Sequence, residues 1–358
     1  MPSRCSTSCR FRRCANRDVV PRMWRWRVKQ QALIINLWMM TDILTITPNP
    51  AVDVATSIDR VADTRKLRCS EPRRDPGGGG INVARVIKRL GGDCIAVYLA
   101  GGATGMLLEQ LLDAEGVPGV RLAIAGETRE NFSVTEACTG RQFRFVLPGP
   151  NVARDEWERC IGQLEALADS PRYLVMSGSL PPGVPVDFYA RLARTARARG
   201  TQIVVDTSGA ALVSALTEGV TLVKPSLAEL SELKGLPLHD EEAWRNAALE
   251  VVRDGRAHVV ALTLGEHGAL LVTADQTLRA PALPTPVSSA IGAGDSFLAA
   301  MVWALNRHAS EKEAFHYALA AASATLLSAG TGLCQPADVD RKYREIAGRK
   351  PEAGVTLP

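Results

Sequence analysis

Short runs of apolar residues alternate with helix-like patterns along most of the chain. The runs at residues 42–46, 173–176, 202–206, 220–223 and 259–263 are apolar at nearly every position. Strands of this kind are buried on both faces, which is typical of a parallel sheet with helices packed against each side. The pattern therefore predicts an α/β protein with a mainly parallel sheet.

Another part of the chain alternates between apolar and polar residues instead. Residues 129–147 contain the stretches NFSVT at 131–135 and RQFRFV at 141–146. A period of two places one face toward water and one toward protein, as in a half-exposed antiparallel sheet. Together with residues 54–74, this segment is expected to form a small β flap over the mouth of the main sheet.

The chain is long enough for one substantial enzyme domain. Its 358 residues are 46% hydrophobic and contain no internal repeat and no low-complexity linker. A chain of this length and composition can bury a large core. We expect one domain over residues 41–350, followed by a short C-terminal tail at 351–358.

Residues 1–40 differ from the rest in charge. They carry nine Lys or Arg against one acid, Asp18, and therefore a formal +8. Subtracting this from the whole chain's +4 leaves a formal charge of −4 for the other residues. The net positive charge of the chain is therefore no reason to expect that the core binds nucleic acid.

The apolar run at 32–40 is too short to span a bilayer and lacks a small-residue cleavage site. We expect a disordered extension or a start codon assigned too early; a genuine basic arm or targeting segment is the alternative.

The cysteines and histidines beyond residue 40 form no metal or redox motif. Cysteines stand at positions 69, 94, 138, 160 and 334 without CxxC spacing, and the five histidines are scattered without HExxH. This distribution favours free core or surface thiols in a reduced, cytoplasmic compartment.

The octapeptide AIGAGDSF at residues 290–297 carries the strongest local signal for chemistry. Its two glycines let a turn approach a ligand closely. The helical pattern that follows points free N–H groups and the positive end of the helix dipole at that ligand, which suits a phosphate. Asp295 in this turn suits a general base for a hydroxyl nucleophile. The plain alternative is a tight loop with an N-capping aspartate.

A second glycine cluster, PGGGG at residues 76–80, runs into an amphipathic helical pattern at 81–90, which Gly91 and Gly92 end. Four consecutive glycines cost backbone entropy and suit a place where a ligand lies against the main chain. Asn82 can offer both a donor and an acceptor there. A flexible linker is the alternative, although a linker rarely opens a well-patterned helix.

A third motif, SGSLPPG at residues 177–183, lies between these two. In this order and at these spacings the three motifs resemble those of the ribokinase-like (PfkB) carbohydrate kinases and, within that family, the ATP-dependent 6-phosphofructokinases of the ribokinase-like type. The resemblance covers about residues 43–347. It implies a ribokinase-like fold, a mainly parallel sheet flanked by helices, with a small antiparallel β flap that closes over the sugar and often mediates dimerisation.

The resemblance implies a Mg-ATP-dependent kinase that phosphorylates fructose 6-phosphate at the 1-hydroxyl to give fructose 1,6-bisphosphate. Asp295 would accept the hydroxyl proton, and the backbone of Gly292, Ala293 and Gly294 would stabilise charge on the γ-phosphoryl group. Tagatose-6-phosphate kinase and 1-phosphofructokinase are the alternatives within this class.

Two other classes of function stay open. One is a non-catalytic sugar-phosphate-binding regulator, against which the presence of Asp295 argues; the other is a nucleic-acid binder that uses the basic arm. We expect neither a nucleic-acid nor a membrane partner, and we expect a homodimer formed through the flap.

The sugar-binding positions of the resembling kinases carry over to this sequence residue by residue. Those implied for the sugar are Asp53, Gly78, Gly79, Asn82 and Ser179. A sugar phosphate needs cations as well, and Lys66, Arg129 and Arg144 in the predicted flap are available to the 6-phosphate. The alternative interpretation of these three residues is a solvated charged face.

Nucleotide contacts are implied for the C-terminal half. Residues 263–271 predict a strand, a glycine turn and a second strand, which resembles the family's ATP loop; a plain β-hairpin is the alternative. The positions implied for the nucleotide are Lys224, Thr263, Gly265, Gly268 and Ser289.

The segment KPSLAE at residues 224–229 departs from the Asn-x-x-Glu motif that is usual in the family. Glu229 stands in the carboxylate position, where it is expected to hold Mg²⁺ through water. Ser226 replaces the amide and Ala228 replaces a lysine, so activity is expected to survive while regulatory ATP binding through those groups stays open. Residues 328–332 also depart from the relatives' monovalent-cation loop, and a K⁺ site there stays open.

Overall fold

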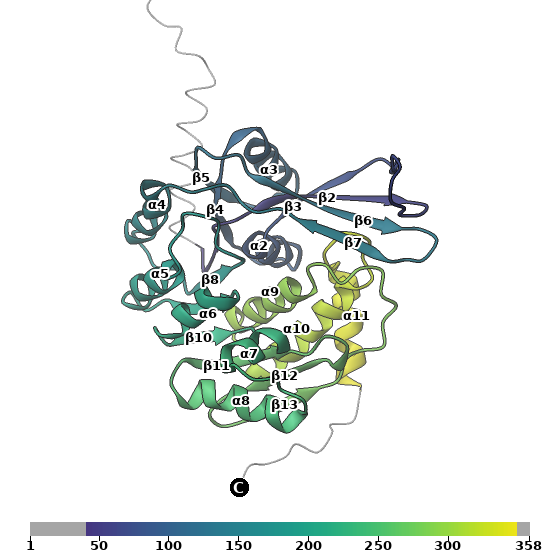
Figure 1. Cartoon of the computed structure of the whole chain (residues 1–358). Helices are drawn as coiled ribbons and strands as arrows, with labels where there is room; N and C mark the ends of the chain where they lie inside the picture. The colour runs from purple at the N-terminus through teal and green to yellow at the C-terminus, as the bar shows by residue number, and fades with distance from the viewer. Residues whose placement is uncertain (1–40, 349–358) are drawn as a thin grey trace, which may run out of the picture.

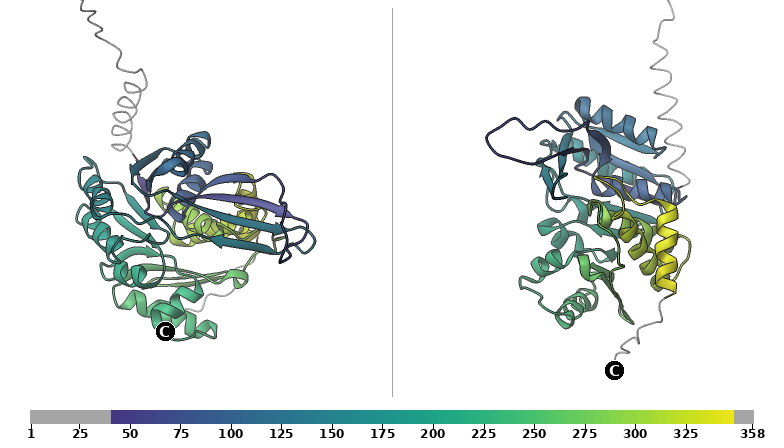
Figure 2. Two further views of the ribbon diagram at one scale, coloured as in Figure 1. Left: turned by 45° about the horizontal axis from the view of Figure 1, so that its top comes forward. Right: turned by 90° about the vertical axis from the view of Figure 1, so that its right-hand side faces the viewer.

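The computed structural model describes residues 41–348. A nine-stranded sheet lies between two layers of helices, and a four-stranded sheet projects from one side of this body (Figures 1 and 2). The fold class predicted from the apolar runs is confirmed. The expectations for residues 1–40 and 351–358 lie outside the described residues.

The main sheet has the strand order β13-β12-β11-β10-β9-β8-β1-β4-β5. The seven strands from β5 to β11 in this order are parallel, and β12 and β13 continue the sheet as antiparallel strands. All five predicted strands are present, with ends within two residues of the predicted ones. The strands are β1 (Ile43–Thr47), β4 (Ile95–Ala100), β5 (Gly119–Ala123), β8 (Tyr173–Ser177), β9 (Gln202–Asp206), β10 (Val220–Val223), β11 (Ala257–Thr263), β12 (Ala269–Val272) and β13 (Thr277–Ala280).

The helices cover both faces of the main sheet, and each face has its own apolar core. Along β8, Tyr173 and Val175 pack into one core, whereas Leu174 and Met176 pack into the other. Both side-chain directions are therefore buried, which explains why the runs are apolar at nearly every position.

The helices fall into two sets by the core to which they contribute. One core contains side chains of α2 (Gly79–Arg89), α3 (Gly102–Ala114), α9 (Ala293–Asn306), α10 (Glu311–Thr325) and α11 (Pro336–Ala347). The other contains side chains of α4 (Arg154–Glu165), α5 (Phe188–Arg197), α6 (Gly209–Leu216), α7 (Leu227–Lys234) and α8 (Glu241–Arg253). A short 3₁₀ helix, η1 (Gly265–His267), joins β11 to β12.

The smaller sheet is the flap that the alternating pattern predicts. Its strands, in the order β3-β2-β6-β7, are β3 (Arg73–Gly77), β2 (Ala51–Ile58), β6 (Arg129–Glu136) and β7 (Gln142–Val146). The β2–β3 and β6–β7 pairs are antiparallel, and a parallel β2–β6 pair joins them. Alternation fixes which side chains share a face but not the direction of pairing, so the sequence could not indicate the parallel pair.

The arrangement of the strands places a site at their carboxyl ends. From β1, the chain reaches β4 on one side of β1 and later β8 on the other side. In open α/β sheets a crevice forms at such a point, outside the carboxyl ends of the strands. The flap rises from the same edge because β2 follows β1 after only three residues.

Cys69, Cys94, Cys138, Cys160 and Cys334 are free thiols, as their spacing predicts. Of the helices within residues 41–348, none combines the length and the apolarity needed to cross a bilayer.

Candidate active site

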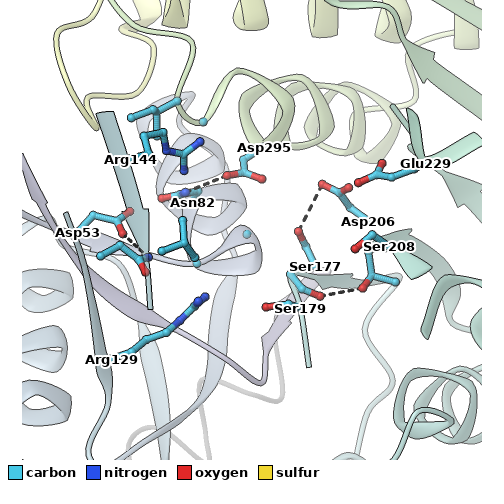
Figure 3. Close-up of a pocket in the computed structure, with 18 residues that line it drawn as sticks. Asp53, Asn82, Arg129, Arg144, Ser177, Ser179, Asp206, Ser208, Glu229 and Asp295 are labelled. Atoms are coloured by element: carbon cyan, nitrogen blue, oxygen red, sulfur yellow. Dashed lines mark hydrogen bonds between the residues drawn. The ribbon is translucent and has the colours of Figure 1, made fainter. Parts of the chain in front are cut away.

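A cavity of about 290 Å³ lies between the carboxyl ends of the central strands, the glycine-rich start of α2, the start of α9 and the flap (Figure 3). This volume is near the lower end of the range for small-molecule sites, roughly 300–1,000 Å³. Ten of the residues named from the sequence line it: Asp53, Gly78, Gly79, Asn82, Arg129, Arg144, Ser179, Glu229, Gly292 and Asp295.

Asp295 stands in the first turn of α9, with its carboxylate in the cavity. The N-cap of this helix is Gly292, whose φ of 77° lies in the left-handed region that favours glycine. The alternative of an N-capping aspartate is therefore wrong. Asn82 donates from Nδ2 to Asp295 Oδ2 at 2.8 Å, while Asp295 Oδ1 has no hydrogen-bond partner within residues 41–348 (Figure 3).

The surroundings of Asp295 tune it toward base chemistry. Burial and the nearby Asp206 carboxylate raise the pKa of Asp295 to about 6, while the Asn82 hydrogen bond and Lys224 oppose the rise. A general base works best with a pKa close to the operating pH. Asp295 is therefore largely ionised at neutral pH and can accept a proton on Oδ1.

The turn before α9 supplies backbone donors. The N–H of Ala293 points back to the Ala290 carbonyl at 3.3 Å, whereas those of Gly292 and Gly294 have no acceptor within the described part of the chain. Unpaired N–H groups at a helix N-terminus bind anions. Of the three residues expected to bind the phosphoryl group through their backbone, Gly292 and Gly294 thus have their donors available.

The glycine cluster allows α2 to begin against the central strands. Gly78 has a φ of 113°, and a Cβ on Gly79 would collide with Ser177 Oγ. A residue with a side chain at Gly79 would therefore push α2 away from β8. The helix starts at Gly79, which confirms that the cluster opens a helix and is no linker.

The flap contributes one carboxylate and two cations to the cavity. The β2–β6 register places Asp53 beside Asn131, whose Nδ2 donates to Asp53 Oδ1 at 2.9 Å. Burial raises the pKa of Asp53, and the Asn131 hydrogen bond and the charges of Arg144 and Arg129 counteract that rise.

The two arginines are held differently. Arg129 donates to the carbonyls of Leu147 and Asn49 at 2.9 and 3.0 Å, and its buried Nε has no partner. The Arg144 side chain forms no hydrogen bond or ion pair with residues 41–348, and its guanidinium points into the cavity (Figure 3). Both groups therefore retain donors for an anionic ligand.

Several cavity residues were missed by the sequence analysis: Asn131, Ser177, Asp206, Thr207 and Ser208. Asp206 forms a buried ion pair with Lys224, 3.0 Å from Oδ1 to Nζ, and Ser177 donates to it at 3.4 Å. Their position in the sequence was the signal. Ser177 directly follows the predicted strand at 173–176 and Asp206 ends the one at 202–206, and ligands of α/β sheets bind at the carboxyl ends of strands. The Lys224 ammonium also lies beside Gly294.

Glu229 is positioned by a capping box at the start of α7. Ser226 Oγ accepts from the N–H of Glu229 at 3.3 Å, and Glu229 Oε2 accepts from the N–H of Ser226 at 2.7 Å. Glu229 Oε1 has no partner among the described residues, and Glu229 lines the cavity. The serine therefore orients the carboxylate.

A Mg²⁺ ion fits this donor set. Within residues 41–348 no cluster of three or more His, Cys, Asp or Glu side chains is arranged to bind a metal. Mg²⁺ commonly keeps several waters and binds one or two carboxylates together with substrate phosphates. Glu229 is the carboxylate that can hold it through water beside bound phosphates.

Eight of the residues named from the sequence do not line the cavity. Ala293 and Gly294 lie between the lining residues Gly292 and Asp295, and Lys224 pairs with the lining residue Asp206. Lys66 lies on the exposed segment between β2 and β3 and does not line the cavity, because β2 ends at Ile58 and the chain leaves the sheet there. Ser289 is 2% exposed, and its hydroxyl donates to Gln142 Oε1. The others, Thr263, Gly265 and Gly268, form the β11–η1–β12 turn beside β10, outside this lining.

The sequence matches the pfkB family of carbohydrate kinases over residues 46–338. The chain is a member of this family. It is therefore a kinase, and the family implies ATP and a metal ion. The ribokinase-like fold expected from the three motifs is confirmed.

Individual relatives agree over nearly the whole described chain. The ATP-dependent 6-phosphofructokinase isozyme 2 of Mycobacterium tuberculosis is 45% identical over 312 residues, which cover 87% of this chain and 91% of the relative. Phosphofructokinase-2 of Escherichia coli, solved in complex with fructose-6-phosphate, superposes with a TM-score of 0.81 at 39% identity, covering 86% of this chain and all of that one. The same E. coli protein solved with potassium gives a TM-score of 0.83 at 40% identity with the same coverage.

The capping box at Ser226 leads to a first prediction. Ser226→Ala removes the N-cap of α7 and is expected to lower the free energy of unfolding by about 1 kcal/mol. Because the cap also orients Glu229, we expect the Mg²⁺ concentration for half-maximal activity to rise by about fivefold. Metal titrations of the steady-state rate measure this.

Ser310→Ala is the matched control. Ser310 and Glu313 form the same capping box at the start of α10, away from the cavity. This variant should lose similar stability without changing the Mg²⁺ dependence. An equal change in Mg²⁺ dependence in both variants would show that Ser226 acts only through global stability.

Proposed function

We propose that the protein transfers the γ-phosphoryl group of ATP to the 1-hydroxyl of fructose 6-phosphate and so forms fructose 1,6-bisphosphate. One observation carries the proposal: a single cavity contains the Asp295 carboxylate at a helix N-terminus and the flap cations Arg129 and Arg144. An acceptor that is itself phosphorylated needs both features, since a base must meet its reacting hydroxyl and cations must meet its distant phosphate.

The chemical step uses the groups around the start of α9. Asp295 Oδ1 accepts the proton of the 1-hydroxyl as that oxygen bonds to the γ-phosphorus, and the bond from phosphorus to the β,γ-bridging oxygen breaks to release ADP. The N–H groups of Gly292 and Gly294, with the Lys224 ammonium beside them, stabilise charge on the transferring group. Mg²⁺ would supply charge neutralisation at the phosphates when bound, and Glu229 would hold it through water.

The sugar side of the cavity fits a polyhydroxylated phosphate ester. Asp53 and Asn82 offer acceptors and donors to hydroxyl groups, as does the backbone of Gly78 and Gly79. Ser179 adds a hydroxyl at the end of β8. The relatives named as phosphofructokinases, one of them solved with fructose-6-phosphate, support the same substrate class.

The nucleotide and cation assignments belong to the same proposal. We assign the binding of ATP to five residues: Lys224, Thr263, Gly265, Gly268 and Ser289. K⁺ is assigned to the loop at residues 328–332, supported by the E. coli structure solved with potassium. In this loop the Ala329 carbonyl accepts from Arg73 at 3.3 Å, so the carbonyls of the other loop residues would carry the ion.

The flap is also assigned as the surface of a homodimer. Phe132 and Phe145 are cross-strand partners on one face of the flap, and they are 38% and 55% exposed. Leu147, directly after β7, is also exposed, whereas Val146 lies on the other face of β7 and lines the cavity. Contiguous apolar surface of this kind marks interfaces between proteins, and sedimentation velocity with Phe145→Asp tests whether the assembly depends on it.

A substrate panel tests the reaction directly. A coupled ADP-release assay should give the highest kcat/KM with fructose 6-phosphate among fructose 6-phosphate, tagatose 6-phosphate, fructose 1-phosphate, fructose and ribose. Tagatose 6-phosphate differs only in the configuration at C4, and fructose 1-phosphate carries its phosphate on the hydroxyl that fructose 6-phosphate offers for reaction. A preference for either identifies the corresponding alternative kinase, and a preference for free sugars refutes a sugar-phosphate site.

Replacing Asp295 tests the base. Asp295→Asn should lower kcat by about 10²–10⁴-fold, as expected for loss of a positioned base, with little change in ATP binding. In the wild type, protonation of Asp295 inactivates the base, so kcat/KM should fall as the pH drops below about 6. Turnover close to wild type in the variant would remove Asp295 from the mechanism.

Replacing the flap arginines tests phosphate recognition. Because Arg144 has no partner to lose within the described chain, Arg144→Ala should leave the flap intact and raise the KM for fructose 6-phosphate by about ten- to a hundredfold. Arg129→Ala should have a similar effect but also loosen the flap, since Arg129 holds two backbone carbonyls. The KM for ATP should change little in both.

Two controls accompany this experiment. Weak use of unphosphorylated fructose should be almost indifferent to Arg144→Ala. Arg141→Ala removes another flap arginine, one that pairs with Glu136 and does not line the cavity, and should leave both substrates unaffected. Equal damage to both substrates in Arg144→Ala would mean that Arg144 supports the flap and does not bind the phosphate.

A further inference from the structure

Arg85 is the largest fully buried polar side chain among the described residues, and the mechanism above does not use it. Only 1% of its surface is exposed, although it carries a permanent charge. It lies on α2, one turn after Asn82 and on the same side of the helix. A buried arginine is expensive unless every donor is satisfied, so its partners indicate its role.

The guanidinium of Arg85 joins three elements. Nε and Nη2 donate to the two carboxylate oxygens of Glu115, at the end of α3, at 3.0 and 2.5 Å. Nη1 donates to the Pro76 carbonyl in β3 at 2.7 Å and to Asn82 Oδ1 at 3.1 Å. Four hydrogen bonds from a planar fork leave the group little freedom to rotate.

These contacts fix the orientation of the Asn82 amide. Arginine has donors only, so the atom of Asn82 that faces Arg85 must be the carbonyl oxygen. The NH₂ group is then directed away from Arg85 and toward Asp295 Oδ2, 2.8 Å away. With the amide reversed, its oxygen would face the carboxylate and its NH₂ would face the guanidinium, so both contacts would become repulsive.

We propose that Arg85 is a positioning residue for phosphoryl transfer: by holding Asn82 Oδ1, it directs the Asn82 NH₂ to Asp295 Oδ2 and leaves Asp295 Oδ1 facing the acceptor hydroxyl. This inference rests on the proposed role of Asp295 as the base. It assigns to the PGGGG–helix segment a second task besides lining the cavity, since the same helix turn that contacts the sugar also sets the geometry of the base.

The other charged groups near Asp295 come from different elements. Asp206 ends β9, Lys224 follows β10, and Asp53 lies in β2. None of them hydrogen-bonds to the Asp295 carboxylate, whose one hydrogen bond within residues 41–348 comes from Asn82. This hydrogen bond holds the carboxylate and favours its charged form. If the amide loses its orientation, the bond is lost.

The test compares Arg85→Met in the wild-type and Asn82→Ala backgrounds. In the wild-type background we expect kcat to fall about tenfold and the acid limb of the pH profile of kcat/KM to move up by about one pH unit. The sign follows from the bond: an NH₂ donor stabilises the ionised carboxylate, so its loss raises the pKa of Asp295 and the base is protonated at higher pH. In the Asn82→Ala background, Arg85→Met should change neither quantity further.

Arg89→Met is the matched control for stability and charge. Arg89 lies one turn further along α2, pairs with the same Glu115 at 3.2 Å and donates to the Leu333 carbonyl, but does not contact Asn82. It should lower the unfolding temperature without moving the acid limb. Should Arg85→Met not fold, Arg85→Lys replaces it: one ammonium cannot reproduce the four bonds, and the limb should again move up, by a smaller amount.

The outcomes separate this inference from the proposed function. An acid limb that stays in place in the Arg85 variants, or that moves equally in the Asn82→Ala background, overturns the positioning role while Asp295 remains the base. A limb that moves equally in Arg89→Met shows a general charge or stability effect and also overturns it. Wild-type turnover in Asp295→Asn would instead refute the base assignment and this inference together.

Discussion

The Asp295 carboxylate must remain charged although it is largely buried, and the residues around it follow from that requirement. Moving a carboxylate out of water favours its neutral form unless donors or cations replace the lost hydration. Here a helix N-terminus, the Asn82 amide and Lys224 supply this compensation, while Asp206 opposes it. The balance leaves a carboxylate that is ionised near neutral pH yet still able to take a proton, as the proposed phosphoryl transfer from a hydroxyl requires.

The same requirement recurs at two other carboxylates of the cavity, Asp206 and Asp53. Asp206 is balanced by Lys224 and Asp53 by Asn131, and burial raises the pKa of both acids. The partner of each acid comes from a neighbouring strand: Asn131 lies in β6, beside β2, and Lys224 directly follows β10, beside β9. This dependence links the order of the main sheet and the register of the flap to the chemistry, since shifting either would leave a buried charge without its partner.

The sequence was informative wherever a local pattern had a single physical cause. Continuous apolar runs predicted the central strands because their side chains are buried on both faces. The glycine turn at Gly292 predicted the start of α9, where the N–H groups of Gly292 and Gly294 have no acceptor among the described residues. The flap could be predicted only in outline. Alternation does not specify strand direction or strand ends, so neither the Asp53–Asn131 contact nor the position of Lys66 outside the cavity could be derived. The role of Arg85 could not be predicted from the sequence either. In the sequence it is an ordinary polar position of an amphipathic helix, and only the structure shows its partners on α3 and β3.

In the proposed function, the two flap arginines would divide phosphate recognition into a fixed and an adaptable part. Arg129 is restrained by the carbonyls of Leu147 and Asn49, so it presents its remaining donors from a defined place at the base of the flap. Arg144 is unrestrained on β7 and exposed, so it must lose side-chain entropy when it binds. A fixed cation contributes more to orienting the distant phosphate, and hence to aligning the reacting hydroxyl with Asp295, whereas a free one contributes mainly attraction. The proposed position of the phosphate would therefore depend on the backbone at the base of the flap as much as on the charges themselves.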